Sequence, residues 1–346
     1  MKHQTTRYGE IPFYKIGTSG NTADAFISKK LFLEYKTKYS FPKKGDILIS
    51  ASGTIGRAVI YDGKPAYFQD SNIVWIDNDE TLVKNDFLFY AYSNVKWNTE
   101  HTTILRLYND NFRNTLIPLP PLNEQIAIAN ILSGLDRYLC VLDALILKKE
   151  GVKKALSFEL LIQRKRLKGF NQAWQRVRLG DIANYLTSNL SAEQITQQGK
   201  IKVYDVNNFI GYTDTTFISD KPYISIVKDG SVGRVRILPP KTNILSTMGA
   251  LIANHRTTTE FLFYLLSNFD FKNFTSGSII PHIYFKDYKE KTIFLPPLNE
   301  QSAIANILSD LDNEIASLKN KKRQFENIKK ALNHDLMSAK IRVLKK

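Results

Sequence analysis

The sequence predicts an α+β protein in which one structural plan occurs twice: two mixed α/β blocks are separated by two long helices that form an antiparallel coiled coil. Three observations predict this fold. The chain carries a near-perfect internal repeat, and each copy of the repeat opens a long heptad pattern. The stretch before each copy alternates short β-branched or aromatic runs with glycine turns. Antiparallel helices would relate the two halves by a pseudo-twofold axis.

The internal repeat is the strongest of these observations. Residues 117–136 (IPLPPLNEQIAIANILSGLD) and 293–312 (IFLPPLNEQSAIANILSDLD) lie 176 positions apart and differ at three of twenty positions. Chance does not produce such a match, so the two segments share a task. The sequence preceding each copy is far more divergent. We therefore divide the chain into four segments, which are 1–119, 120–173, 174–295 and 296–346.

The two constant segments are predicted to be long helices. Pro121 and Pro297 suit a helix start, and Asn123 and Asn299 are good capping residues. Apolar residues then follow at alternating steps of four and three, which is typical of a coiled-coil seam. The seam is expected to contain Leu132, Leu135, Leu139, Leu142, Leu308, Leu311, Ile315 and Leu318. Lysines interrupt it at Lys149, Lys153, Lys322 and Lys329, and Cys140 beside it is expected to be a small core residue.

The divergent blocks are predicted to be mixed α/β. Runs rich in Val, Ile and aromatic residues at 46–50 and 58–61 flank a glycine turn, as do the runs at 223–227 and 234–238. Short helices fit 84–94 and 258–268. The two blocks echo each other: SGTIGR at 52–57 matches DGSVGR at 229–234.

Composition indicates a globular protein with a polyanionic partner. The 346 residues include 48 Lys and Arg against 33 Asp and Glu, which gives a net charge of +15 and a pI near 9.5. The excess is +3 for residues 1–119 and +4 for each of the other three segments, so no single tail carries it. Nucleic acid is the first candidate partner. Lysines on the helices are better explained as a solvated coiled-coil face.

Several classes of site are excluded or disfavoured. Cys140 is the only cysteine, which excludes a disulfide framework within one chain and a cysteine-based zinc site. The five histidines are scattered, so no metal site is expected. The chain has no run of about 18 apolar residues and no apolar leader, which favours a cytoplasmic protein without a membrane partner.

No catalytic signature is present, so we expect a protein that binds and does not catalyse. The sequence has neither a phosphate-binding Gly-rich loop nor a dinucleotide fingerprint. The repeated Pro-Pro pair is followed by Leu122 or Leu298, whereas a base-methylating enzyme would place an aromatic residue there to stack on a flipped base. We expect no catalytic residues, no cofactor and no metal.

Polar and basic residues cluster at two places in each block. One cluster surrounds the glycine turn, where close backbone approach to a phosphate is possible, although an ordinary hairpin turn explains the same residues. The other cluster lies at 106–113 and 282–286, where Arg suits guanine and Asn suits adenine. The candidate DNA contacts are Lys43, Lys44, Ser52, Thr54, Arg57, Arg106, Tyr108, Asn109, Asn111 and Arg113 in the first block, and Ser231, Arg234, His282, Tyr284 and Lys286 in the second.

The chain resembles the specificity subunit of type I restriction–modification enzymes. The repeated LPPLNEQ-x-AIANILS-x-LD segments carry the resemblance, together with the opening WQRVRLGDI at 174–182 and FPKKGDILIS at 41–50. The resemblance implies two target-recognition domains, 1–119 and 174–295, joined by conserved helical regions at 120–173 and 296–346. It also implies that the subunit is not catalytic and that the domains bind double-stranded DNA.

The resemblance further implies protein partners. Two modification subunits, which carry S-adenosylmethionine and the methylation chemistry, are expected to dock on the helices, and restriction subunits can join. Partner-binding residues are then expected at the two helix starts, which are Pro121, Leu122, Asn123, Glu124 and Gln125, and Pro297, Leu298, Asn299, Glu300 and Gln301. Because the two blocks differ, the target should be bipartite and asymmetric.

One departure and one alternative accompany this interpretation. The first block has no counterpart of the opening WQRVRLGDI, so we expect it to lack an element at its N-terminal side. The alternative function is an assembly scaffold, in which the coiled coil holds partners and the blocks bind protein without DNA specificity. A scaffold would show no salt-sensitive affinity for DNA.

Overall fold

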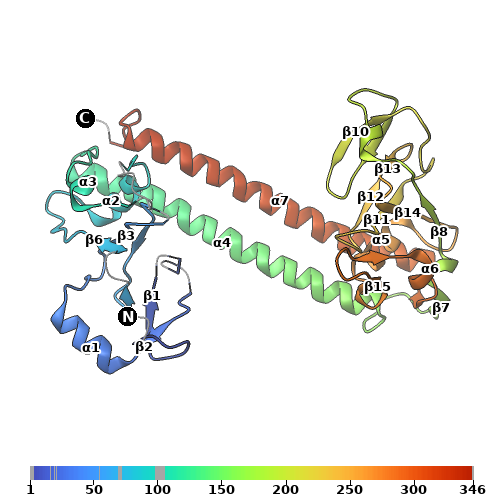
Figure 1. The fold of residues 1–346 in the computed structure, drawn as a ribbon, viewed down its shortest axis with the longest axis horizontal. Helices are drawn as coiled ribbons and strands as arrows, with labels where there is room; N and C mark the ends of the chain where they lie inside the picture. The colour runs from blue at the N-terminus through green and yellow to red at the C-terminus, as the bar shows by residue number, and fades with distance from the viewer. Residues whose placement is uncertain are drawn as a thin grey trace. The chain divides into compact units, whose positions relative to one another are not determined.

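The computed structural model describes residues 4–15, 17–18, 20, 22–53, 55–68, 72–97 and 106–344 (Figure 1). The chain forms two compact units that each combine stretches far apart in the sequence. Unit 1 comprises Met1–Asp143 with Asn320–Lys346, and unit 2 comprises Ala144–Lys319. The unit boundaries fall within the two long helices, so packing partitions the chain differently from the four sequence segments.

The described residues of unit 1 form two small three-stranded sheets, three short helices and parts of both long helices. Its sheets have the strand orders β2-β1-β5 and β4-β3-β6. The elements are β1 (Ile11–Tyr14), β2 (Phe26–Ile27), α1 (Lys29–Lys38), β3 (Ile47–Ser50), β4 (Ala58–Ile60), β5 (Tyr67–Phe68), β6 (Ile73–Trp75), α2 (Asn85–Tyr92), α3 (Asn109–Arg113), the start of α4 (Leu122–Leu161) and the end of α7 (Leu298–Met337).

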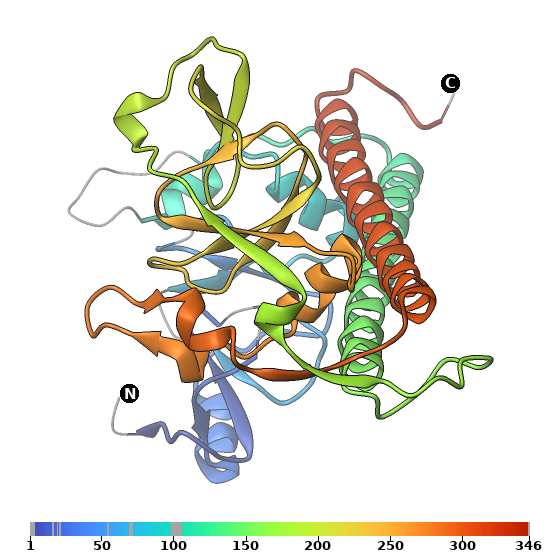
Figure 2. The ribbon, with the colours of Figure 1, turned by 90° about the vertical axis from the view of Figure 1, so that its right-hand side faces the viewer.

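Unit 2 repeats the two sheets of unit 1 and adds further strands, but has no helix at the place of α1 (Figure 2, yellow-green to orange). Its sheets have the orders β10-β9-β13, β12-β11-β14-β8, β15-β16 and β17-β7. The elements are β7 (Gln175–Arg178), η2 (Leu179–Asp181), β8 (Ala183–Thr187), η3 (Ala192–Gln194), β9 (Ile201–Tyr204), β10 (Phe209–Thr213), β11 (Tyr223–Val227), β12 (Val235–Leu238), β13 (Asn243–Ile244), β14 (Met248–Ala253), α5 (Thr259–Ser267), η4 (Lys272–Phe274), β15 (Thr275–Ser276), β16 (His282–Ile283), α6 (Phe285–Tyr288) and β17 (Thr292–Leu295).

The two units share one topology. β1 pairs antiparallel with β2 and parallel with β5, and β9 pairs in the same way with β10 and β13. β3 lies between β4 and β6, and β11 between β12 and β14, with every pairing antiparallel. β7 and β8 of unit 2 have no counterpart among the described residues of unit 1. The predicted strands at the glycine turns and the predicted short helices, α2 and α5, are confirmed.

The helices α4 and α7 pack side by side (Figure 1), which confirms the predicted α+β class with two long helices. Within unit 1, Asp136 and Asp143 of α4 pair with Lys329 and Lys322 of α7, so partner numbers fall as α4 advances. Within unit 2, Lys149 and Lys153 of α4 pair with Glu314 and Asp312 of α7. The helices are therefore antiparallel in each unit.

The predicted seam is buried in part, and its interruptions have a structural cause. Leu132, Leu142, Leu308 and Ile315 are buried, and each fully buried leucine contributes about 1.5–3 kcal/mol relative to an exposed one. Leu135, Leu139, Leu311 and Leu318 are half-buried. The four interrupting lysines each form one of the inter-helix ion pairs described above, since a long lysine stem can lie over the seam and reach a carboxylate on the other helix.

Two details differ from the sequence predictions. Cys140 is exposed and is not a core residue, because it lies just outside the half-buried seam position Leu139. The helices begin at Leu122 and Leu298, so Asn123 and Asn299 lie within the first turn and do not cap it from outside. Their side chains still accept a hydrogen bond from the next backbone N–H, at Glu124 and Glu300 (both 2.9 Å), which satisfies one free donor of the turn.

Candidate nucleic-acid interface and repeated helix junction

The glycine turns have the same geometry in both blocks. Gly56 (φ +78°) and Gly233 (φ +80°) adopt the left-handed conformation that favours glycine. An added Cβ would lie 2.2 Å from the Trp97 ring at Gly56, and 2.6 Å from the Phe271 ring at Gly233. The glycines are thus required by backbone conformation and by an aromatic residue packed on each turn, so they do not by themselves indicate a phosphate site.

The structure brings the two predicted polar clusters of each block together. Ser52 forms a β-bridge with Arg106, and Asp229 forms the corresponding bridge with His282. The bridges are flanked by hydrogen bonds from the Leu107 N–H to the carbonyl of residue 51 (2.8 Å) and from the Ile283 N–H to that of residue 228 (2.9 Å). Each block therefore presents its turn and its second cluster as one surface, built on a shared backbone.

Side chains on this surface differ between the blocks. The Ser52 hydroxyl is buried and donates to the Asn72 Oδ1 (2.8 Å), whereas Asp229 Oδ1 lies 2.6 Å from His282 Nδ1. The guanidinium of Arg106 lies 5.8 Å from the centre of the Tyr108 ring, and the ammonium of Lys286 lies 5.5 Å from that of Tyr284. Both tyrosines are exposed. In such a pair, the exposed ring can stack on a base and the cation can contact a phosphate.

Some of the remaining residues predicted to contact DNA already bind a neighbouring group of the chain. Lys43 forms an exposed ion pair with Asp77 (3.0 Å), which raises the pKa of the lysine, and Arg113 lies 3.4 Å from Asp110. The Asn111 side chain accepts a hydrogen bond from the Tyr108 N–H (2.6 Å) and so holds the start of α3. Thr54 lies outside the described residues. The exposed or half-exposed candidates are Lys44, Arg57, Asn109, Ser231 and Arg234.

A second site, the helix junction, is formed by the repeated Asn-Glu-Gln motif. The Gln301 side chain is buried; its Nε2 donates to the carbonyls of Arg256 (2.9 Å) and Pro296 (2.8 Å), and its Oε1 accepts from the Thr258 N–H (3.0 Å). The equivalent Gln125 donates to the carbonyls of Leu82 and Pro120 and accepts from the Lys84 N–H. Each glutamine thus fastens the start of its long helix to the block that precedes it.

The glutamate of each motif pairs with an arginine that lies just beyond the end of the other long helix. Glu124 is buried and accepts a two-pronged pair from Arg342 (3.1 and 2.5 Å), and Glu300 accepts the same pair from Arg166 (3.2 and 2.7 Å). Arg342 holds the pKa of Glu124 below its usual range. The two arginines are themselves 176 positions apart. In unit 2 the Trp174 Nε1 also donates to Glu300 (2.9 Å).

A tyrosine, an aspartate and a lysine complete the junction in each unit. The Tyr90 hydroxyl donates to Asp136 (2.8 Å), which is paired with Lys329. In unit 2, Tyr264 donates to Asp312 (2.9 Å), which is paired with Lys153 (2.5 Å). Burial, and then the adjacent aspartate, raises the pKa of both tyrosines. The hydroxyls therefore stay protonated and keep donating.

These contacts bear on the ten residues predicted to bind a partner. Leu122, Asn123, Leu298 and Asn299 are exposed, as is Pro121, and Pro297 is half-buried, so they can meet another chain. The glutamates and glutamines are buried inside their own unit, where they join helix to block. The sequence contains one signal for this junction. The repeat offset of 176, applied to the ends of the helices, relates Lys153 to Lys329 and Arg166 to Arg342.

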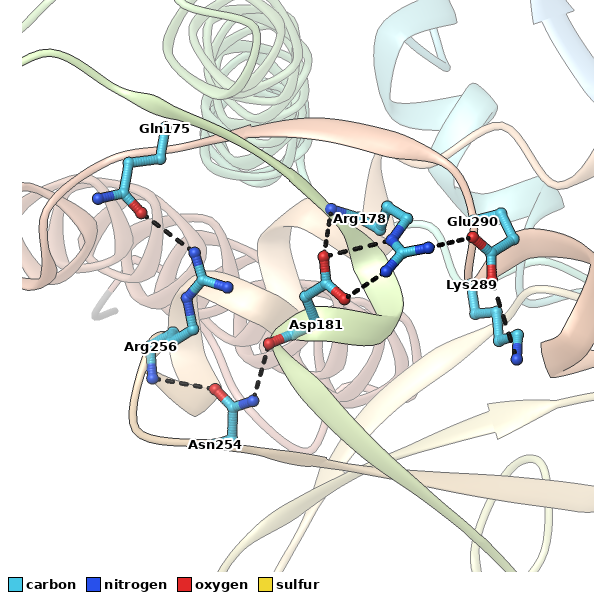
Figure 3. Close-up of polar contacts among 7 residues, drawn as sticks. All are labelled: Gln175, Arg178, Asp181, Asn254, Arg256, Lys289 and Glu290. Carbon is cyan, nitrogen blue, oxygen red and sulfur yellow. Dashed lines mark hydrogen bonds and ion pairs between the residues drawn. The ribbon is translucent and has the colours of Figure 1, made fainter.

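The opening of the second block is held by a polar network (Figure 3). The Arg178 guanidinium donates to Glu290 (3.0 Å) and to Asp181 (3.4 Å), and the Asn254 side chain donates to the Asp181 carbonyl (2.9 Å). The Arg178 backbone N–H and guanidinium lower the pKa of Asp181. Arg256 donates to Gln175 (3.1 Å). The network ties the first residues of the block to its last.

Within the described part of the chain, no group of three or more His, Cys, Asp or Glu side chains is arranged to hold a metal ion. None of the helices over the same residues is long and apolar enough to cross a membrane.

Comparison with known proteins gives consistent matches. A family model described as type I restriction modification DNA specificity domain matches residues 1–147 and 171–327. The putative type I restriction enzyme specificity subunit S.HindORF215P of Haemophilus influenzae is 64% identical over 137 residues, which cover 39% of this chain and 36% of that protein. The putative MjaX specificity subunit of Methanocaldococcus jannaschii is 28% identical over 335 residues, covering 86% and 79%.

Solved structures share the fold. The crystal structure of the type I restriction–modification S subunit from M. genitalium aligns with a TM-score of 0.63 at 20% identity, covering 97% of this chain and 91% of that one. A chain from a structural study of complex assembly and conformational transition in the type I system aligns with a TM-score of 0.55 at 14% identity, covering 94% and 91%.

Proposed function

The chain belongs to the type I restriction modification DNA specificity family, and we propose that it reads an asymmetric, two-part DNA target with one half-site for each block. The observation that carries this proposal is the surface built by the glycine turn and the second cluster. Its backbone is the same in both blocks, whereas the side chains differ: Ser52 stands where Asp229 stands, and Arg106 where His282 stands. Equal scaffolds with different side chains suit two different half-sites.

We assign the DNA contacts to the exposed cations and aromatic rings of these surfaces. Arg57 and Arg234 follow the two turns, and Tyr108 and Tyr284 each lie beside a cation. Such groups suit phosphate contact and base stacking. The buried Ser52 and the capping Asn111 then act indirectly by holding this surface in place.

The nearly identical helix starts support docking of two modification subunits. Each start exposes a leucine, Leu122 or Leu298, in the same helical turn as the buried junction residues. A repeated surface of this kind suits two copies of one partner. Modification subunits would supply the methylation chemistry and restriction subunits would join the full complex, so this chain would contribute recognition and no catalysis, in the cytoplasm with the DNA.

DNA binding by the isolated chain tests the proposal. The blocks carry only +3 and +4, enough for a few phosphate contacts each, so binding alone should be weak, should not depend on sequence, and should fall steeply between about 50 and 200 mM salt. Sequence-specific binding should appear once modification subunits are added. Fluorescence anisotropy with labelled duplexes at several salt concentrations measures both.

Matched variants sharpen this test. Arg234→Ala should reduce the salt slope by about one, whereas Arg323→Ala on the exposed face of α7 should leave it unchanged. Tight sequence-specific binding by the chain alone would contradict the proposed division of labour. Affinity that does not respond to salt would favour the scaffold function instead.

A further inference from the structure

The positive charge of the first block is concentrated in one segment. Residues 29–44 contain six lysines and one glutamate, a net charge of +5, whereas the whole block of residues 1–119 carries +3. The rest of the block is therefore net negative, at −2, although it includes the predicted surface at Arg57 and Arg106. A polyanion that approaches this block is attracted by residues 29–44 and not by the remainder as a whole.

The structure places these lysines on α1 and on the loop that follows it. The Phe32 side chain of α1 is buried in a core cluster with β1 and β2, and Leu31 and Tyr35 pack against the same cluster. Within unit 1, α1 lies beside β1 and β2 and apart from α2 and α3 (Figure 1). All six lysines are exposed, and we call them the α1 patch: Lys29, Lys30, Lys36, Lys38, Lys43 and Lys44.

Carboxylates neutralise little of the charge of the α1 patch. Lys43 pairs with Asp77 (3.0 Å), but both side chains are about three-quarters exposed, so water screens the pair. The other five lysines form no ion pair with a residue that the structure describes. Glu10 accepts a hydrogen bond from the Lys29 backbone N–H (3.1 Å) and so serves the first turn of α1, and Glu34 lies on α1 itself.

An exposed aromatic ring lies next to the α1 patch. The Lys38 ammonium lies 5.6 Å from the centre of the Tyr39 ring, and Tyr39 is 49% exposed. The same pairing of a cation with an exposed ring occurs at Tyr108 and Tyr284, on the surfaces that we assign to DNA. A solvated lysine face does not call for such a ring, whereas a nucleic-acid surface combines both groups.

The α1 patch belongs to the first block alone. In unit 2 the stretch between β10 and β11, residues 214–222, takes the place of the stretch between β2 and β3. It forms no helix and contains two aspartates and one lysine. The patch is therefore not part of the scaffold that the two blocks share.

We propose that the α1 patch binds the sugar–phosphate backbone of the DNA beside the half-site read by the first block. Lysine ammonium groups act as point charges on phosphates, and such contacts add affinity and fix the position of a protein without reading bases. The inference rests on the proposed function and adds to it a contact surface that only the first block has. It gives the two blocks unequal shares of the salt-dependent affinity.

A charge-removal experiment tests the proposal. The full chain carrying Lys29→Ala, Lys30→Ala and Lys38→Ala is titrated into a fluorescent duplex of arbitrary sequence at several salt concentrations. The slope of log affinity against log salt should fall by about two to three, and by the same amount for any duplex sequence. Lys36 is kept, because its ammonium lies 5.3 Å from the centre of the Phe41 ring and its stem helps to cover the core.

The matched control removes the same charge from exposed positions of α7, with Lys321→Ala, Arg323→Ala and Lys330→Ala. Its slope should equal that of the parent chain. Thermal unfolding followed by circular dichroism should give the same midpoint for the α1 variant as for the parent, because the three replaced lysines are exposed.

Four outcomes would overturn the inference. An unchanged slope in the α1 variant, while Arg234→Ala still lowers it, would reject the patch and leave the proposed function standing. A parent chain without any salt-dependent affinity for DNA would reject both. Loss of co-purification with a modification subunit, at an unchanged slope, would assign the patch to a protein partner. A changed first half-site in the methylated motif would show that the patch reads bases.

Discussion

Gln301→Ala should destabilise unit 2 by about 3 kcal/mol, because it leaves several buried polar groups without a partner. The amide donates to the carbonyls of Arg256 and Pro296 and accepts from the Thr258 N–H and the Thr257 hydroxyl (2.9 Å). Alanine removes all four hydrogen bonds and leaves a cavity at the point where helix α7 joins its block. Chemical denaturation followed by circular dichroism measures the loss.

The control is Ser302→Ala, at the adjacent exposed position of the same helix. Its hydroxyl bonds only the Leu298 carbonyl one turn earlier, so a change within about 0.5 kcal/mol is expected. Gln125→Ala should produce the corresponding loss in unit 1. If Gln301→Ala were as mild as Ser302→Ala, the junction would not be what fastens the helix to its block.

Inserting one heptad into both α4 and α7, where the units divide at Asp143 and Asn320, should lengthen the gap in the DNA target and leave both half-sites unchanged. A heptad preserves the seam and adds about 10 Å of helix. Since base pairs are spaced about 3.4 Å apart, the gap should grow by about three base pairs. Methylated positions in cellular DNA, mapped with the variant and its modification subunits, report the gap directly.

A heptad in α4 alone is the matched control. It makes α4 one heptad longer than α7, so the helix pairs of unit 1 (Asp136 and Asp143 with Lys329 and Lys322) and those of unit 2 (Lys149 and Lys153 with Glu314 and Asp312) cannot form together, and the complex should lose activity. Half-sites that changed while the gap stayed constant would show that the helices do not set the spacing.

Much of the architecture could be predicted from local pattern. The repeat, the heptads and the glycine turns each act over short stretches, so the long helices, the paired strands at 47–60 and 223–238 and the division into similar halves followed from them. Exposure of Cys140 did not follow, because a residue beside a seam is buried or exposed according to how closely the partner helix packs.

The contacts of the helix junction could not be predicted from local sequence pattern, for a different reason. Glu124 and Arg342 are more than two hundred residues apart, and only the antiparallel register brings them together. The burial of the glutamate and glutamine therefore did not follow from the sequence, since charged and amide side chains are rarely buried without a dedicated partner. Their role in binding a partner stays a prediction. The same register explains the lysines that interrupt the seam. The candidate DNA contacts stay predictions, because base contacts depend on DNA geometry as well as on the chain.

The most direct test of recognition by two blocks is a map of methylated adenines in cellular DNA, made with and without this chain, after confirming that it co-purifies with a modification subunit from the same genome. The account predicts a gapped, asymmetric two-part motif that disappears when the chain is absent. A complex that forms without any motif, or a motif that persists in the absence of the chain, would contradict it.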